Sequence, residues 1–579
     1  MCNRFVTSGL AFYSALLTLS QVQAQTGDVL TGRGPFTHAD SLKGTYDAAR
    51  AGSDVQQYYL DLRLRPETQT LEGSVDIRYQ VTSDPSPTFR FELDTHLVVH
   101  QVQQVALDGS AVTGPLTWQR EGPFYAVAVP QPGGPGSELR IRIHYGGRPA
   151  VAKNPPWNGG FTWAKDPAGN PWVSVSCQGE GASLWWPCKD HPADEPDAGV
   201  ELTLTVPKGL VAVGNGRLMS TQDLDSLSRF TWRVTAPINL YAVNLTVARF
   251  AHLQGSYPSA VAADSLTLDH YVLAANATQA RTHFGAQVPR MLRAFEHYFG
   301  PYPWYADGFK LVETPFWGME HQSSIAYGNN YGYLPGWFPY PRKDLFDYII
   351  VHEAGHEWFG NSLTHTDKAD MWIHESFTTY SEALYVEYYH GPAEALRYLL
   401  AQRRMIGGTD AIQGPRGVAF EGWADSDMYF KGANVLHTLR TATQYADPAA
   451  DSTQWFAALR ALAQTYARQT LSTETVVGFF AQRYGDWVRP FFDQYLNYIA
   501  LPVLEYKPLK RNTDGIPAIA YRVVAQAPGF KLPIEVQLGT TRKTLWATAE
   551  WQELPVDPEA TPRFDDRNLL ITLREVPGR

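Results

Sequence analysis

The sequence predicts an α+β protein of several domains, with a β-rich amino-terminal part, a mainly helical middle part and a small β-rich carboxyl-terminal part. At 579 residues the chain is too long for a single hydrophobic core. Apolar and polar residues alternate from about residue 55 to 250, follow helical spacing after about 251, and alternate again beyond 502. We therefore expect domains over residues 25–250, 251–501 and 502–579, preceded by a leader over residues 1–24.

Composition and charge narrow the class of protein. Hydrophobic residues make up 44% of the chain and charged residues 18%, which is typical of a folded globular protein rather than a disordered one. The net charge of −10, without any long basic run, argues against a nucleic-acid partner.

The first 24 residues have the pattern of an export signal. Arg4 supplies a positive charge, the run from Phe5 to Ser20 is mostly apolar, and Val22-Gln23-Ala24 offers a small-x-small cleavage site. A membrane anchor is the competing interpretation, but the apolar run is short and is interrupted by Ser and Thr. We expect a mature chain that begins near Gln25, is periplasmic or secreted, and does not associate with a membrane.

Removal of the leader leaves two cysteines, Cys177 and Cys188. In an exported protein they could form a disulfide, and they could equally be buried free thiols. The sequence leaves both alternatives open.

Alternation in the amino-terminal part is clearest in Tyr59–Leu64 and Leu202–Val206, and the turn sequence Gln131–Gly136 separates strands. The stretch from Asn154 to Trp186 is rich in Trp, Gly and Pro. We expect it to form an irregular loop system, either bordering a cleft or simply packed on the domain.

In the middle part, Val288, Leu292, Phe295 and Phe299 predict a helix that ends at Gly300. Further helices are expected over about residues 343–359, 375–390, 455–466 and 476–484. Beyond Pro502, the alternation of Ile534, Val536 and Leu538 with polar residues predicts strands.

The run His352-Glu353-Ala354-Gly355-His356 lies within the helix expected over residues 343–359. Histidines at i and i+4 share one face of a helix and can bind one metal ion, and Glu375 on the next helix can supply a third ligand. Two imidazoles and one carboxylate leave an open position on zinc, which is typical of catalytic rather than structural sites. Glu353 can then accept a proton from water that attacks a carbonyl, so the pattern predicts one zinc ion and hydrolysis of an amide or related bond. We expect the nearby His365 and His374 to be surface residues or neighbours of the ligands, not ligands themselves.

At these residues the chain resembles the gluzincin aminopeptidases, the family of aminopeptidase N, aminopeptidase B and leukotriene hydrolase. The similarity covers the zinc helix from His352 to Asn361, the segment Trp372–Phe377 with the third ligand, and Trp317-Gly318-Met319-Glu320-His321, which is similar to the family's Gly-x-Met-Glu-Asn motif. His321 replaces the asparagine of that motif. The resemblance implies a β-saddle domain, a thermolysin-like catalytic domain and a small carboxyl-terminal β-sandwich, without the large helical domain of longer family members.

The resemblance also implies roles for residues around the zinc site. Glu320 is expected to bind the free amino group of a peptide, with Gly318 and Met319 lining the same substrate site. Tyr429, in a segment similar to that of the family's catalytic tyrosine, is expected to stabilise the oxyanion. Gln178 is expected to reach from the amino-terminal domain to the bound amine.

The sequence thus predicts a monomeric zinc aminopeptidase acting on peptides with a free amino terminus. Two alternatives are an epoxide hydrolase of the leukotriene-hydrolase type and a catalytically silent binding protein on the same fold. Retention of both Glu353 and Tyr429 disfavours the silent protein.

Overall fold

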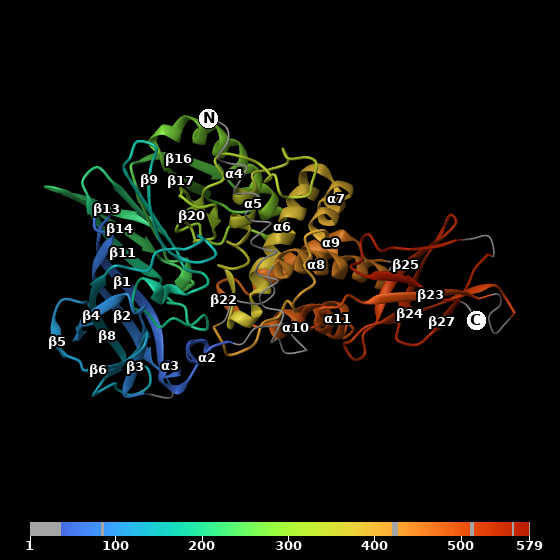
Figure 1. Ribbon diagram of the computed structural model, residues 1–579, viewed down its shortest axis with the longest axis horizontal. Coiled ribbons are helices and arrows are strands. Elements are labelled where there is room, and N and C mark those ends of the chain that lie inside the picture. Colours follow the sequence, from blue (N-terminus) through green and yellow to red (C-terminus); the bar gives the residue numbers. More distant parts are fainter. Residues whose placement is uncertain are drawn as a thin grey trace.

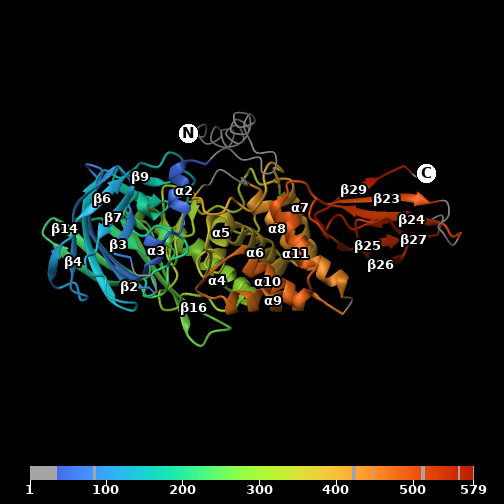
Figure 2. The same cartoon turned by 90° about the horizontal axis from the view of Figure 1, so that it is seen from below.

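A computed structural model describes residues 36–577 apart from 83–85, 420–425, 448, 510–514 and 558–560. Figure 1 shows three parts in a row: a β-rich domain, a helical domain in the middle, and a β-rich module at the far end, which Figure 2 confirms from a second direction. The predicted α+β arrangement is confirmed. The expected leader lies outside the described residues.

The amino-terminal domain is built around an eight-stranded sheet. Along β1 (Ser53–Arg65) side chains alternate between buried and more exposed, with Leu60, Leu62 and Leu64 in the core. The sheet runs in the order β13 (Arg217–Leu224), β14 (Leu227–Val234), β11 (Val200–Pro207), β1, β2 (Thr70–Val81), β8 (Glu138–Gly147), β4 (Leu97–Val105) and β5 (Val112–Pro115). Two smaller sheets complete the domain: β12 (Val211–Gly214), β15 (Leu245–Ala248), β10 (Pro171–Ser176) and β9 (Gly160–Lys165), and β3 (Thr88–Glu92), β7 (Phe124–Ala128) and β6 (Trp118–Glu121). Two short helices, α2 (His38–Gly44) and α3 (Ala48–Ala51), precede β1.

The region from Asn154 to Trp186 is more regular than predicted, because it contains the antiparallel strands β9 and β10. Pro156, Trp157, Gln178 and Gly179 line a cavity, so the region borders a cleft. Cys177 and Cys188 are free and buried, which corresponds to the thiol alternative.

The middle domain combines a five-stranded sheet with eight helices among its described residues. The sheet runs β16 (Phe250–Pro258), β17 (Ser265–Leu273), β18 (Leu311–Glu313), β20 (Ile325–Tyr327) and β19 (Gly318–Met319). The helices are α4 (Ala277–Phe299), α5 (Tyr348–Gly355), α6 (Trp372–His390), α7 (Pro392–Arg403), α8 (Asp427–Ala446), α9 (Ser452–Thr465), α10 (Thr473–Tyr484) and α11 (Val488–Asn497), and β21 (Leu363–His365) pairs with β22 (Gln469–Leu471).

The helix predicted over residues 343–359 is wrong in its bounds, because α5 covers only Tyr348–Gly355. Asp347 caps its amino end by accepting hydrogen bonds from the backbone N–H groups of Ile349 and Ile350, at 3.1 and 3.3 Å. Lys343 instead donates to backbone carbonyls of Pro335 and Phe338, which holds the preceding segment as a loop. The helix of the third ligand, α6, begins at Trp372, one turn earlier than predicted.

The carboxyl-terminal module consists of two small sheets. One runs β27 (Gln552–Pro555), β24 (Ala518–Val524), β23 (Val503–Leu509) and β29 (Thr572–Glu575), and the other β26 (Thr541–Ala547), β25 (Leu532–Leu538) and β28 (Pro562–Phe564). Buried residues of this module, such as Leu532 and Ile534, form one continuous core with the helical domain.

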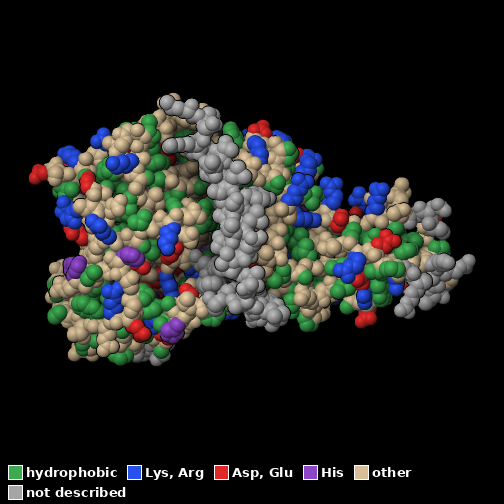
Figure 3. Space-filling model, in the orientation of Figure 1, with side chains coloured by type: hydrophobic (Ala, Val, Ile, Leu, Met, Phe, Trp, Pro, Cys, Tyr) green, Lys and Arg blue, Asp and Glu red, His purple; other side chains and the backbone are tan. Residues whose placement is uncertain are grey.

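On the face drawn in Figure 3, Lys and Arg side chains lie interspersed with Asp and Glu over the described surface. Within the described part of the chain, no helix is both long and apolar enough to cross a bilayer.

Candidate active site

A cavity of about 350 Å³ lies where the amino-terminal domain meets the helical domain. Both domains contribute to its lining. All nine residues predicted for the site line it: Gln178, Gly318, Met319, Glu320, His352, Glu353, His356, Glu375 and Tyr429. The fold thus collects one strand (β19), three helices (α5, α6 and α8) and a loop of the amino-terminal domain around one space.

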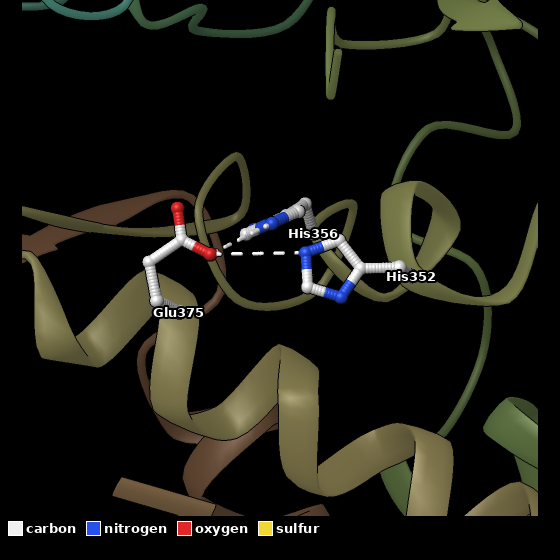
Figure 4. A group of neighbouring side chains, drawn as sticks. All are labelled: His352, His356 and Glu375. Atoms are coloured by element: carbon white, nitrogen blue, oxygen red, sulfur yellow. Dashed lines mark ion pairs between the residues drawn. The ribbon is translucent and has the colours of Figure 1, made fainter. Parts of the chain in front are cut away.

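His352 of α5, His356 directly after this helix and Glu375 of α6 converge on one point (Figure 4). Glu375 Oε2 lies 3.8 Å from His352 Nε2 and 3.4 Å from His356 Nε2. The other ring nitrogens are fixed, because His352 Nδ1–H donates to Glu382 Oε1 at 2.7 Å and His356 Nδ1–H donates to the carbonyl of Phe359 at 3.0 Å. Each Nε2 therefore presents its lone pair towards Glu375.

These three side chains fit a zinc ion. Ligand atoms bound tetrahedrally at about 2.1 Å lie about 3.4 Å apart, close to the spacings seen here. Glu375 Oε2 is buried and has no hydrogen-bond partner among the described residues, as expected of an atom reserved for a metal. Glu382 and the Phe359 carbonyl orient the imidazoles, as the outer partners of zinc ligands usually do.

Glu353 also lies in α5 and faces the same cavity. Burial raises the pKa of Glu353 to about 8; Glu320 and Glu375 add to the shift, while both histidines oppose it. A carboxylate with a pKa near neutrality can both accept and return a proton. Gly318 leaves room for it, since a Cβ at that position would lie 2.4 Å from Glu353 Oε1.

Glu320 forms the centre of a hydrogen-bonded group that links the two domains. Its Oε1 accepts from Gln178 Nε2 at 2.5 Å and from the Tyr241 hydroxyl at 2.9 Å. Gln178 also lies 3.5 Å from Glu375 Oε1, so one amide side chain spans the predicted amine anchor and the third ligand. Burial raises the pKa of Glu320.

The loop that carries Gln178 is held by two lysines from other segments. Lys368, just before α6, donates to the carbonyl of Gln178 at 3.3 Å and to that of Gly179. Lys43 of α2 donates to the carbonyl of Glu180 and pairs with Asp190 at 3.0 Å. Through Lys368, the position of the Gln178 loop therefore depends in part on the helical domain.

Tyr429 lies in the first turn of α8, and its ring centre is 6.2 Å from that of His352. Burial acts to raise the pKa of Glu375, but His356, His352 and a hydrogen bond from Tyr429 together hold it below its usual value. The phenol thus reaches the ligand cluster from the side of α8.

His365 and His374 are both buried, so the surface alternative is wrong for each. His374 Nε2 accepts from the backbone N–H of His365 at 3.1 Å, and His374 Nδ1 lies 3.4 Å from the Tyr241 hydroxyl. His374 therefore orients Tyr241, which in turn contacts Glu320. Tyr241 and Lys368 were not predicted from the sequence. Tyr241 is one of 31 tyrosines, and nothing in the sequence distinguishes it from the others before the domains are brought together.

Two family models match the two parts of the chain that build this site. The model described as Peptidase M1 N-terminal domain matches residues 55–241, and the one described as Peptidase family M1 domain matches residues 286–495. Together they span more than half of the 579 residues.

Three individual proteins show what the chain is similar to. Aminopeptidase B of Rattus norvegicus is 23% identical over 517 residues, which cover 84% of this chain and 72% of the relative. The crystal structure of an M1 zinc metallopeptidase from Deinococcus radiodurans superposes with a TM-score of 0.62 at 22% identity, covering 78% of this chain and 95% of the other. Native yeast LTA4 hydrolase superposes with a TM-score of 0.60 at 17% identity, covering 78% and 70%.

The structural similarities establish a shared fold, and the family models match the segments that contribute Gln178, Glu320 and the zinc ligands. From both matches and from the ligand set, the chain belongs to peptidase family M1 and is a zinc-dependent hydrolase.

Proposed function

We propose that the chain is an aminopeptidase that removes the first residue of peptides with a free amino group. The observation that carries the proposal is the position of Glu320. One of its carboxylate oxygens lies within 4.8 Å of ligand atoms of both Glu353 and His356. A protonated amine bound by Glu320 is therefore held about one residue's length from the zinc ligands, which selects the first peptide bond.

His352, His356 and Glu375 would hold the zinc ion, which supplies a Lewis acid for the peptide carbonyl and lowers the pKa of water. Glu353 takes a proton from the attacking water and passes it to the leaving amine. Gln178 and Tyr241 orient the Glu320 carboxylate by donating hydrogen bonds to it. Tyr429 donates its phenolic proton towards the oxygen that becomes negative in the transition state.

The similar proteins support this proposal. Aminopeptidase B relatives match over most of the chain, and one of the superposed Deinococcus radiodurans structures is described as bound to a Tyr-Ser-Ala substrate. A peptide with a free amino terminus is the ligand that a buried carboxylate beside zinc ligands would recognise.

Aminoacyl anilides test the proposal directly. The purified chain should cleave free-amine anilides and leave their amino-acetylated counterparts intact, because acetylation removes the positive charge that Glu320 binds. A chelator should abolish the cleavage and added zinc should restore it. Equal cleavage of acetylated and free substrates would contradict the exopeptidase assignment.

We also propose export with cleavage after Ala24, on the strength of the leader pattern in residues 1–24. Expression with the full leader in a bacterial host should yield a periplasmic or extracellular protein whose intact mass corresponds to a chain starting at Gln25. A cytoplasmic chain that retains its leader would contradict the proposal.

A further inference from the structure

We propose that the enzyme prefers peptides whose first residue is large and uncharged, either aromatic or long aliphatic. This inference rests on the proposed aminopeptidase function and assigns the substrate class of its site. It is carried by the lining of the 350 Å³ cavity outside the residues that bind zinc, amine and oxyanion.

Apart from Ser426, the remaining lining of the cavity is mostly apolar and aromatic. Three tryptophans from separate loops, Trp157, Trp317 and Trp337, line it together with Tyr348, Met405 and Met428. Apart from Glu320, Glu353, Glu375 and the two histidines, no charged side chain of the described residues lines the cavity. A substrate side chain that enters it therefore meets mainly carbon and sulfur atoms.

We call these six aromatic and methionine residues the wall of the cavity. Trp317 lies at its centre. Its ring is stacked on Tyr348, with ring centres 5.5 Å apart and an angle of 13° between the planes. Trp337 packs edge-on against it at 5.8 Å, and Trp157 of the amino-terminal domain lies at 6.5 Å. The ring nitrogen of Trp317 donates to Asn329 Oδ1 at 3.3 Å, which fixes the ring and satisfies its polar atom.

The backbone connects the wall directly to Glu320, which is proposed to bind the amine. Trp317 directly precedes β19 and Glu320 directly follows it, so one two-residue strand carries both the ring and the carboxylate. A first residue whose amine is bound by Glu320 has its side chain beside this wall. The flexible side chains of Met405 and Met428 can adapt to side chains of different shape.

Charge disfavours peptides whose first residue is acidic or basic. An acidic side chain would enter a cavity that already holds three carboxylates, and no lysine or arginine of the described residues lines it to pair with the added charge. A basic side chain gains attraction from the aromatic faces, but the only carboxylates that line the cavity in the described part of the chain are those assigned to the amine, the water and the metal. A large neutral side chain fills the space without an unpaired charge.

The test uses anilides that differ only in the first residue, since a constant leaving group isolates the pocket for that residue. We expect kcat/KM for leucyl, methionyl and phenylalanyl substrates to exceed that for alanyl by at least about 10- to 100-fold, because a single methylene in an apolar pocket can already contribute roughly 10-fold. Lysyl and arginyl substrates should fall about 10-fold or more below leucyl, and aspartyl should be the poorest.

Two variants assign the preference to the wall. Trp157→Ala and Trp317→Leu should each lower the ratio of leucyl to alanyl kcat/KM by about 10-fold. Trp551→Ala is the matched control, because Trp551 packs against Lys507 and Arg522 in the carboxyl-terminal module and does not line the cavity. The control should leave the ratio unchanged. Trp157 is 46% exposed, so its replacement tests the wall even where a change at Trp317 impairs folding.

The outcomes separate this inference from the proposed function. Failure to cleave any free-amine anilide overturns the aminopeptidase function. Cleavage with the highest kcat/KM on alanyl, basic or acidic substrates leaves that function standing and overturns the preference. A preference for large residues that appears only at the second position of dipeptides also overturns it, because the cavity would then accept the residue after the scissile bond.

Discussion

At the residue scale, the position of the Glu353 carboxylate depends on Gly318 in β19. Gly318→Ala would place a Cβ 2.4 Å from Glu353 Oε1, so the carboxylate must move. Because a displacement of about 1 Å in a catalytic group can lower a rate about 100-fold, we expect kcat to fall by 10- to 100-fold with unchanged zinc content. Gly285→Ala is the control, since its Cβ would meet open space on α4. Equal activity of the two variants would contradict this role of Gly318.

The removal of a single hydroxyl tests the role of Tyr429. Tyr429→Phe keeps the ring that lies 6.2 Å from His352 and removes only the proton donor. Loss of a comparable oxyanion donor lowers kcat by about 100- to 1,000-fold. Steady-state kinetics should show this loss in kcat with little change in KM, because the hydrogen bond forms mainly in the transition state. A change confined to KM would indicate a substrate-binding role instead.

At the scale of elements, the loop from Cys177 to Gly181 joins the two domains at the site. Lys368, on the segment leading into α6, bonds to its Gln178 and Gly179 carbonyls. Lys368→Met should let this loop move, weaken the Gln178 to Glu320 hydrogen bond and raise KM for free-amine substrates about 10-fold, with a smaller effect on kcat. Lys208→Met removes an exposed lysine that does not line the cavity and should leave both constants unchanged. A pure loss of kcat in the Lys368 variant would contradict a positioning role.

The elements also show how far the sequence could predict this site. The i, i+4 spacing of His352 and His356 and the helical pattern of α4 are local signals, and both are present in the structure. The bounds of α5 were not predictable, because Asp347 and Lys343 end the preceding loop through contacts that periodicity does not reveal. Tyr241 contacts Glu320 across 79 positions of sequence, a separation at which only the folded chain brings them together.

At the scale of the whole molecule, the two domains that build the active site also enclose a second, much smaller cavity. Its volume is about 30 Å³, enough for one or two water molecules. The amino-terminal domain contributes Asp190, His191, Asp194 and Glu195 to its lining, and the helical domain contributes His365 and Lys368. Glu195 Oε1 is buried and has no hydrogen-bond partner among the described residues. Burial, reinforced by the neighbouring Asp194, raises the pKa of Glu195 to about 8.

This shift makes the stability of the domain junction depend on pH. With this raised pKa the folded state keeps a proton on Glu195 up to about pH 8, whereas the unfolded chain releases it near the ordinary glutamate pKa of 4.5. Between these pH values the folded state binds more protons than the unfolded chain. The contribution of Glu195 to the free energy of unfolding is therefore fully present below pH 4.5 and is lost as pH rises through about 8.

Glu195→Gln mimics the protonated form of Glu195 at every pH. The Tm of the unaltered chain should therefore fall relative to that of the variant between pH 5.5 and pH 8.5, by at least about 2 °C. Glu550→Gln, at an exposed position of the carboxyl-terminal module, serves as the control and should follow the unaltered chain. Parallel melting curves for the unaltered chain and Glu195→Gln across this range would show that Glu195 is ionised in the folded protein, and that the junction tolerates its charge.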